Sequence, residues 1–279
     1  MTETKDFVKV QRTDDLWNFI KSDGTFLCEK WFDFVGDFSE GFAIVRREDG
    51  LYNFIKPDGT ILCKKWFNFA SDFSEGLAIV QREDGLWNFL KPDGTFLSTE
   101  WFKMAYNFSE GFAEVQRTNR KWSFIKPDGT FLCKEWFKLV GGFSNGFSRV
   151  QRTNGKCNCI KRDGTFLCKE WFKRVFDFSN GFVQVQRDDD LWNYVKLDGT
   201  FLCEEWFRNV WVFSEGFAIV QRKDELYNFL KLDGTFLSTE WFEDIDSFYD
   251  GFAGVQRKDG KWYYLTTDGT LTETREDNK

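Results

Sequence analysis

One dipeptide, Trp-Phe, returns along this chain at a fixed interval of 35 residues. It occurs seven times without insertion or deletion, at Trp31, Trp66, Trp101, Trp136, Trp171, Trp206 and Trp241. The array runs from about residue 6 to about residue 270, which gives eight copies of the first half of the unit and seven of the second. Self-similarity at a period of roughly 20–50 residues is typical of solenoids, propellers and other arrays. We therefore expect a single repeat domain, residues 1–279, whose first and last copies are incomplete.

Turn signals divide each copy into short strands. In one copy the first strand spans about Leu77–Arg82 and the second Leu86–Lys91. Asp84-Gly85 lies between them, a pair that tolerates the positive φ angles of a tight hairpin. We expect a third strand, Thr95–Phe102, to follow a Pro-Asp-Gly turn and to carry the Trp-Phe pair. A short segment before Phe-Ser-Glu-Gly is a candidate fourth strand.

Both faces of these strands are apolar. Trp87 and Phe89 point to one side of the second strand, and Leu86 and Leu90 point to the other. A sheet with one solvated face would alternate apolar and polar residues, so each meander is expected to lie between its neighbours. The sequence predicts an all-β fold of tandem 35-residue antiparallel meanders, β-propeller-like with seven or eight blades. The alternative is an open β-repeat array, or solenoid, with capped ends.

The unit resembles the WG repeat of bacterial and phage proteins, in which a Trp-Gly strand, an Asp-Gly turn and a Phe-Ser-Glu-Gly-Leu-Ala segment recur. The matching residues are Trp87-Asn88-Phe89, Asp93-Gly94 and the segment 73–78, and the likeness covers residues 6–270. The namesake glycine is replaced in every copy, by Asn18, Asn53, Asn88, Ser123, Asn158, Asn193, Asn228 and Tyr263. The resemblance implies a noncatalytic β-repeat module and transfers no catalytic residue.

Composition excludes several classes of function. The chain has no His, which excludes Ser-His-Asp and Cys-His catalysis and His-ligated metal sites. Its net charge of −7 argues against general nucleic-acid binding. Neither a signal peptide nor a membrane span is visible, so no membrane partner is expected. Five of the seven Cys share one repeat position with Ser98 and Ser238, which favours free thiols and a reducing, cytoplasmic location.

The candidate catalytic groups have structural explanations. The aspartates of the Asp-Gly-Thr turns, such as Asp58 and Asp93, are explained by turn hydrogen bonding. Cys157, Cys159 and Cys168 are three thiols, whereas structural zinc takes four ligands. We interpret them as small buried hydrophobic residues. The sequence therefore predicts no enzyme activity, no cofactor and no metal.

An Arg ends the first strand in every copy. The eight residues are Arg12, Arg47, Arg82, Arg117, Arg152, Arg187, Arg222 and Arg257. The structural interpretation is that each pairs with an acid of a neighbouring repeat or stacks on its Trp. The functional interpretation is a rim of guanidinium groups for carboxylates or phosphates.

Charge is uneven among the copies. The window 141–175 holds eight cations against two acids, the cations being Arg149, Arg152, Lys156, Lys161, Arg162, Lys169, Lys173 and Arg174. One interpretation is drift on a solvated face. The other is a site that docks an acidic protein surface or a polyanion. We predict a noncatalytic scaffold for protein–protein interaction. The alternative is a glycan-binding or small-ligand-binding, lectin-like module, which exposed tryptophans would favour.

Overall fold

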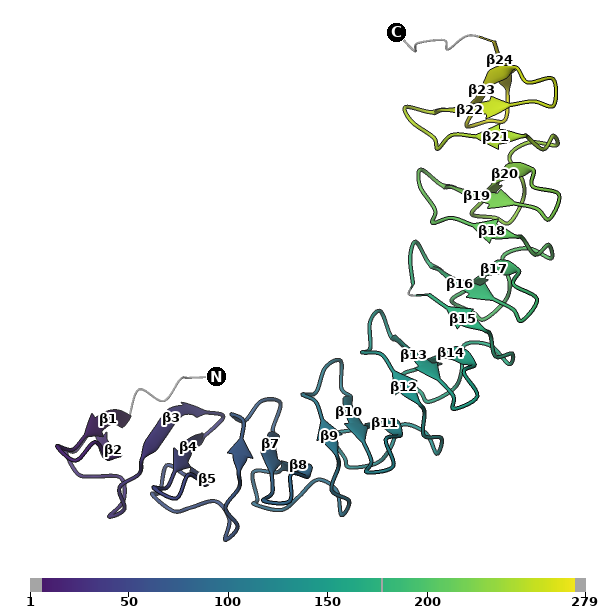
Figure 1. Cartoon of the computed structure of the whole chain (residues 1–279). Helices are drawn as coiled ribbons and strands as arrows, with labels where there is room; N and C mark the ends of the chain where they lie inside the picture. The colour runs from purple at the N-terminus through teal and green to yellow at the C-terminus, as the bar shows by residue number, and fades with distance from the viewer. Residues whose placement is uncertain (1–6, 177, 274–279) are drawn as a thin grey trace. The chain divides into compact units, whose positions relative to one another are not determined.

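The computed structural model describes residues 7–176 and 178–273, which form strands and turns (Figure 1). Within these described ranges, no helix is long and apolar enough to cross a membrane. The chain groups into two compact units, the first ending at Phe143 and the second beginning at Ser144. The expectation that residues 1–279 form a single domain stays a prediction.

In the second copy a strand of six residues, β3, precedes two shorter ones, and each later copy contributes a two-residue strand followed by two longer ones. The first unit contains β1 (Phe7–Gln11), β2 (Trp17–Lys21), β3 (Phe34–Ser39), β4 (Phe42–Arg46), β5 (Tyr52–Ile55), β6 (Phe69–Ala70), β7 (Ala78–Gln81), β8 (Trp87–Leu90), β9 (Met104–Ala105), β10 (Ala113–Gln116), β11 (Trp122–Ile125) and β12 (Leu139–Val140). The second contains β13 (Phe147–Gln151), β14 (Cys157–Lys161), β15 (Arg174–Val175), β16 (Phe182–Gln186), β17 (Trp192–Lys196), β18 (Asn209–Val210), β19 (Phe217–Gln221), β20 (Tyr227–Lys231), β21 (Asp244–Ile245), β22 (Phe252–Gln256), β23 (Trp262–Thr266) and β24 (Leu271–Thr272).

We number the copies by their two longer strands, so β1–β2 belongs to the first copy, β7–β8 to the third, β10–β11 to the fourth, β13–β14 to the fifth and β16–β17 to the sixth. The sheets are antiparallel meanders, with the order β6-β7-β8 in the third copy and β18-β19-β20 in the seventh. Ile79 of β7 lies opposite Phe89 of β8, and Phe69 of the short strand lies opposite Gln81. The predicted all-β class and the 35-residue antiparallel meander are confirmed. Closure into a ring stays a prediction.

The expectation of a third full strand at Thr95–Phe102 is wrong. This segment touches β8 only at two isolated bridges, Trp87 with Phe102 and Leu90 with Phe96. In this copy the side chain of Asn88 binds the irregular segment: its amide nitrogen donates to the carbonyl oxygens of Ser98 at 2.8 Å and Glu100 at 3.0 Å. These carbonyls are satisfied by a side chain instead of a strand partner.

The same asparagine occurs in six copies and is buried in each. Its side-chain oxygen also accepts the next backbone N–H, as from Phe89 at 2.8 Å. The six residues are Asn18, Asn53, Asn88, Asn158, Asn193 and Asn228. The residue that replaces the family's glycine is thus a buried clamp that holds the irregular segment of its own copy.

The predicted hairpin turns form as expected. Gly85, between β7 and β8, has a φ of 78°, and its N–H donates to the carbonyl of Arg82. Gly94, in the Pro-Asp-Gly turn, has a φ of 79°, and a Cβ at this position would lie 2.8 Å from the carbonyl oxygen of Leu62 in the preceding copy. Glycine at this turn therefore supplies both the positive φ and the close approach of one copy to the next.

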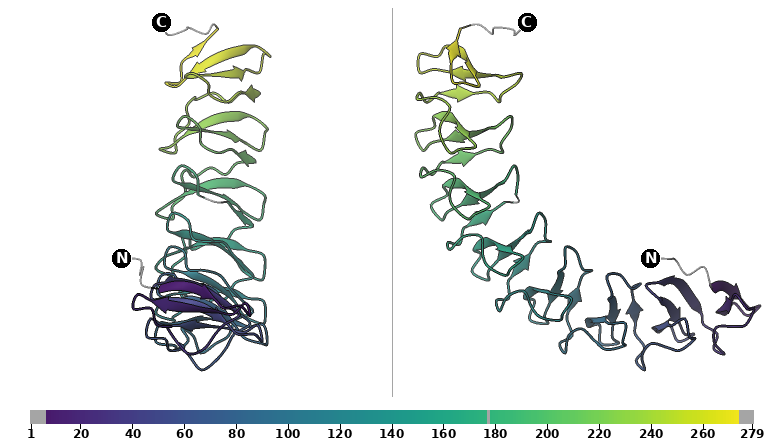
Figure 2. Two further views of the ribbon diagram at one scale, coloured as in Figure 1. Left: turned by 90° about the vertical axis from the view of Figure 1, so that its left-hand side faces the viewer. Right: turned by 180° about the vertical axis from the view of Figure 1, so that it is seen from behind.

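Successive sheets within each unit lie face to face (Figures 1 and 2). Between the third and fourth copies, Ile79 and Phe89 pack in one core cluster with Val115 and Ile125. The Phe of each Trp-Phe pair belongs to these cores and is 2% exposed or less. The Trp of each pair is only half-buried. Trp136, for example, lies at the margin of the core, whereas Phe137 is buried in it.

Candidate functional site

The conserved geometry of each copy places an Arg over a Trp. Arg82 follows β7, and its guanidinium carbon lies 4.2 Å from the ring centroid of Trp101. The corresponding distance is between 3.5 and 4.9 Å in the other six copies that have the Trp. In the eighth copy, Arg257 lies over Tyr263 at 4.8 Å. The guanidinium covers a ring face that would otherwise meet solvent.

The same arginines form ion pairs within the array. Arg82 contacts Asp84 with Nη2 2.5 Å from Oδ2, and hydrogen bonding to Arg82 lowers the pKa of Asp84. In the fourth copy, where Asn119 replaces this aspartate, Arg117 turns to Glu100 of the preceding copy at 2.6 Å. These contacts agree with the structural interpretation of the arginines, in which each stacks on a Trp or pairs with an acid.

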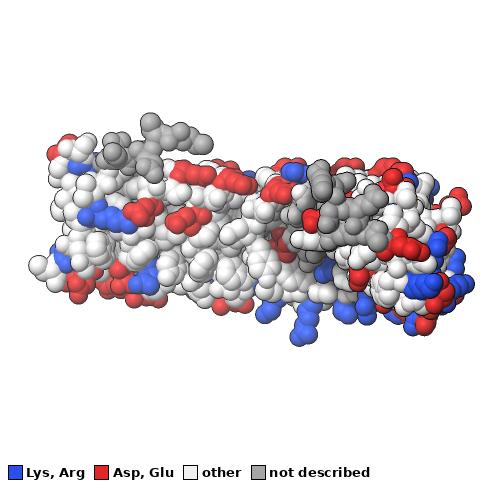
Figure 3. Space-filling model, turned by 90° about the horizontal axis from the view of Figure 1, so that it is seen from above, with Lys and Arg blue, Asp and Glu red and all other residues white. Residues whose placement is uncertain are grey.

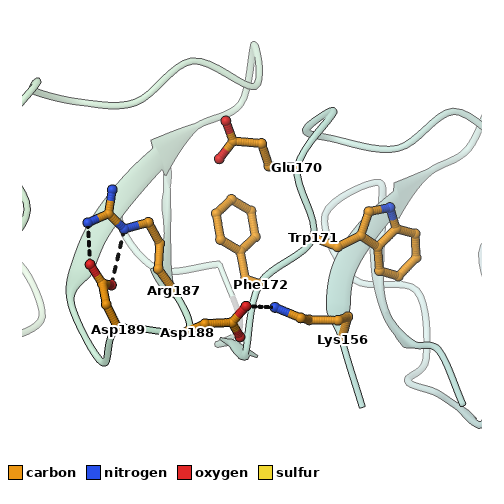
Figure 4. Close-up of a pocket in the computed structure, with 7 residues that line it drawn as sticks. All are labelled: Lys156, Glu170, Trp171, Phe172, Arg187, Asp188 and Asp189. Carbon is orange, nitrogen blue, oxygen red and sulfur yellow. Dashed lines mark hydrogen bonds and ion pairs between the residues drawn. The ribbon is translucent and has the colours of Figure 1, made fainter. Parts of the chain in front are cut away.

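A groove lies between a Trp-Phe segment and the hairpin of the following copy. In the first unit its volume is about 370 Å³, and its walls include Lys65, Trp66, Arg82 and Asp84. The equivalent groove in the second unit, 105 residues on, measures about 430 Å³ and is lined by Lys156, Glu170, Trp171, Phe172, Arg187, Asp188 and Asp189 (Figure 4). The recurrence indicates that the groove is a property of the repeat.

Three of the eight predicted basic residues are engaged inside or beside the second groove. Lys156 forms an ion pair with Asp188 (Figure 4), and Lys173 forms one with Asp190. Arg152 lies 3.5 Å from the centroid of Trp171. The fold therefore explains part of the positive charge of the fifth copy, because the hairpin of the sixth copy supplies matching acids.

Four other members of the set are exposed: Arg149, Arg162, Lys169 and Arg174. Arg149 lies on β13 and donates to the carbonyl oxygen of Val175 on β15 at 3.3 Å, so it reaches the strand that carries Arg174. Lys161 ends β14 half-buried, at a position where most copies also have Lys. Figure 3 shows Lys and Arg side chains gathered along one margin near the middle of the face drawn.

The sequence interpretation did not identify the acids that pair with these cations. Asp188, Asp189 and Asp190 form a run at the hairpin of the sixth copy, and two of the three pair with lysines of the fifth. The available signal was the alternation of charge between adjacent copies. An excess of cations followed 35 residues later by an excess of acids predicts pairing across the interface between copies.

The remaining candidate groups have structural roles. Asp58 Oδ1 accepts from the N–H of Thr60 at 2.8 Å and from its hydroxyl at 2.6 Å, and these bonds lower the pKa of Asp58. Cys157, Cys159 and Cys168 are buried in one core cluster with Phe172. Burial raises the pKa of Cys168 to about 11, which disfavours the reactive thiolate. Among the described residues, no group of three or more Cys, Asp or Glu is placed to hold a metal ion.

Comparison with known proteins gives weak structural likenesses. No curated protein matches the chain. Similar solved structures include apo AztD from Citrobacter koseri, with 13% identity, coverage of 95% of this chain and 92% of that chain, and a TM-score of 0.32. BamB from Moraxella catarrhalis has 10% identity, coverage of 94% of each chain and a TM-score of 0.29. The WD40 beta propeller domain of Doa1 has 12% identity, coverage of 82% and 90%, and a TM-score of 0.27.

TM-scores this low support no argument about the family, so the repeat residues have to be compared instead. A family model for the WG containing repeat matches residues 17–52, 54–87 and 242–262. Four of the boundaries, Trp17, Tyr52, Trp87 and Trp262, are the same aromatic position of the second strand. The resemblance read from the sequence is confirmed: three parts of the chain match the model of the WG containing repeat.

Proposed function

We propose that this protein is a noncatalytic repeat scaffold that docks an acidic protein surface on the basic residues of its fifth copy. The observation that carries the proposal is the exposure of Arg149, Arg162, Lys169 and Arg174 in one copy of a chain whose net charge is −7. We call these four residues the basic edge. The seven free cysteines support a reducing, cytoplasmic setting.

The repetition of the candidate reactive groups from copy to copy supports a noncatalytic role. Catalysis needs a particular set of perturbed groups in one place. Here the turn aspartates repeat in every copy, and the repeated arginines are held by rings and carboxylates. Residues that differ between copies are therefore the better candidates for specific recognition.

The basic edge would affect how an acidic partner approaches the chain and how it is oriented. A cationic patch on a negative body attracts an acidic partner and turns it toward one copy. Exposed charges are screened over about 8 Å at physiological ionic strength. Binding at the basic edge should therefore weaken steeply as salt rises.

The alternative of a glycan-binding module has less support at the Trp-Phe tryptophans. Sugar stacking needs an open ring face, whereas Arg82 covers Trp101 and Arg187 covers Trp206, each at 4.2 Å. Phe96 meets the edge of Trp101 at a centroid distance of 4.9 Å. Both contacts reduce the area that a sugar ring could cover.

The test compares two charge-reversal variants of the full chain. In one, Arg149, Arg162, Lys169 and Arg174 are changed to Glu. In the control, four exposed cations outside the fifth copy are changed to Glu: Arg208, Lys223, Lys258 and Lys261. Both variants have the same net charge, so a difference between them reports position. Poly-glutamate is the probe, and its dissociation constant is measured by fluorescence anisotropy over a salt series.

We expect the basic-edge variant to bind poly-glutamate about tenfold more weakly than the control or worse, a difference of roughly 1.4 kcal/mol. Circular dichroism melts establish that both variants remain folded. Equal affinities for the two folded variants would overturn the proposal. A wild-type chain that does not bind poly-glutamate at low salt would overturn it too.

A further inference from the structure

A cavity of about 150 Å³ lies in the second unit, between the sheet of the sixth copy and the segment that precedes β19. Its walls include Phe176, Phe182, Gln184, Tyr194, Val212 and Phe213. The cavity is separate from the Trp grooves and from the basic edge. It uses no residue of either.

The residue equivalent to Gln184 differs among the copies. Gln184 of β16 stands where the second, third and seventh copies have Ile44, Ile79 and Ile219. In the third copy Ile79 is 8% exposed and packs in the core between sheets. The sixth copy has an amide at this place, whereas the first, fourth and fifth copies have Lys9, Glu114 and Arg149.

Two further departures meet at the same place. Tyr194 replaces the phenylalanine found as Phe54 and Phe89, and Val212 replaces the aspartate found as Asp37 and Asp72. Drift would scatter such changes over the surface of the copies. Here Gln184, Tyr194 and Val212 line one cavity.

The polar groups of the cavity are fixed in direction. Tyr194 is 1% exposed, and its hydroxyl donates to the backbone carbonyl of Trp211. Burial raises the pKa of this hydroxyl well above its ordinary value, so it stays neutral. Tyr194 also forms a side-chain hydrogen bond with Gln184, so the polar group of a ligand would join or replace the contact between these two side chains.

The surroundings favour an uncharged, flat ligand. No charged side chain is among the described residues that line the cavity, and a buried charge without a partner would be strongly unfavourable. Phe182 and Phe213 form a stacked pair with a centroid distance of 4.9 Å. Phe176, Trp211 and Val212 are 46%, 42% and 62% exposed, so apolar surface adjoins the cavity.

We propose that this cavity is a binding site for a small uncharged aromatic molecule of one ring that carries one hydroxyl or similar polar group. The volume suits one ring, because an engineered cavity of about 150 Å³ holds benzene. The ring would contact the aromatic pair Phe182 and Phe213, and its polar group would meet Gln184 and Tyr194.

Phenol is the probe, and the full-length chain is the protein. Binding is followed by chemical shift changes of the Trp211 indole N–H in an NMR titration. The filling variant is Gln184→Ile, which installs the residue that three other copies use. Its control is Glu114→Ile, the same substitution site in the fourth copy. Benzoate, a charged ring of similar size, tests the requirement for neutrality.

We expect phenol to bind the wild type and Glu114→Ile alike, and to bind Gln184→Ile about tenfold more weakly or not measurably. Benzoate should bind no variant. Equal phenol affinity for the wild type and Gln184→Ile would overturn the proposal, as would equal binding of benzoate and phenol. If Gln184→Ile does not fold, Val212→Asp, which restores the common residue at the cavity wall, is expected to weaken phenol binding as well. The test does not involve poly-glutamate, so its outcome is independent of the proposed scaffold function.

Discussion

The third and fourth copies have the same backbone and different side chains at three informative positions. Asn88 of the third copy is buried and donates to two carbonyls. Ser123 of the fourth copy is also buried, and its hydroxyl oxygen has no hydrogen-bond partner. The clamp that defines most copies is missing from this one, although β11 forms as β8 does.

The other two differences also disfavour the folded state of the fourth copy relative to the third. Gly85 has a positive φ of 78° without strain, whereas Arg120 takes a φ of 66° at the equivalent turn. Ile79 packs in the core, whereas Glu114 is half-buried and burial raises its pKa. The fourth copy tolerates these local losses because the core that it shares with the third copy still holds its sheet.

Removing the clamp from the third copy should have the largest effect. Asn88→Ala leaves the carbonyls of Ser98 and Glu100 without their donor. We expect the free energy of unfolding to fall by about 2–3 kcal/mol, since buried polar groups left unpaired are costly. Denaturant melts give the value. The exposed Asn119→Ala is the control, and a loss for Asn88→Ala no greater than the control's would contradict the role of the clamp.

Restoring the clamp to the fourth copy is the reverse experiment. Ser123→Asn should raise the free energy of unfolding by about 1 kcal/mol, the usual net contribution of a hydrogen bond. Ser123→Ala separates this gain from the removal of an unpaired hydroxyl. The prediction fails if asparagine is no better than alanine in matched urea melts.

The turn of the fourth copy should also gain from the residue of the third. Arg120→Gly removes the steric strain of a positive φ at a side-chain-bearing residue, offset by the entropy of glycine in the unfolded chain. We expect a net gain of up to about 1 kcal/mol. Arg120→Ala keeps the Cβ and removes the charge, so it should show no gain. A gain of equal size for alanine would assign the effect to charge.

Glu114 should produce the smallest effect, visible as a pH dependence. Its folded pKa is raised by burial, so the folded state binds its proton more tightly than the unfolded state, and stability rises as pH falls through this range. Glu114→Gln should therefore be more stable than the wild type above the folded pKa, with the advantage vanishing below the unfolded pKa. Melts from pH 4 to 8 measure the difference, with the exposed Glu83→Gln as control. A difference that does not vary with pH would contradict this account.

Much of the fold follows from the sequence because copies of one pattern can be compared within the same chain. The spacing of Val80, Gly85 and Gly94 fixes the hairpins, and these formed as predicted. The irregular segment 95–102 was not predictable from strand patterns, because its apolar residues resemble those of a strand while its backbone meets β8 only at two isolated bridges. Burial of Phe102 in place of Trp101 depends on the stacking of one copy on the next.

The candidate sites were less predictable than the fold. The cations of the fifth copy stood out in the sequence, yet the engagement of Lys156 and Lys173 by acids of the sixth copy depends on contacts between copies. Gln184 and Tyr194 could be noticed as departures from the repeat. Their convergence on one cavity needs the register of β16 with β17, in which they lie opposite each other.

Amide hydrogen exchange on the full chain tests the central claim most directly, which is that a buried side-chain clamp sets the local stability of each copy. The amides of β8 and β11 occupy equivalent places, and the fourth copy lies further from the chain end than the third. We predict that Phe124 and Ile125 exchange about tenfold faster than Phe89 and Leu90, and that Ser123→Asn closes most of this gap. Equal protection of the two strands in the wild type, or no change in β11 on restoring the asparagine, would contradict the account.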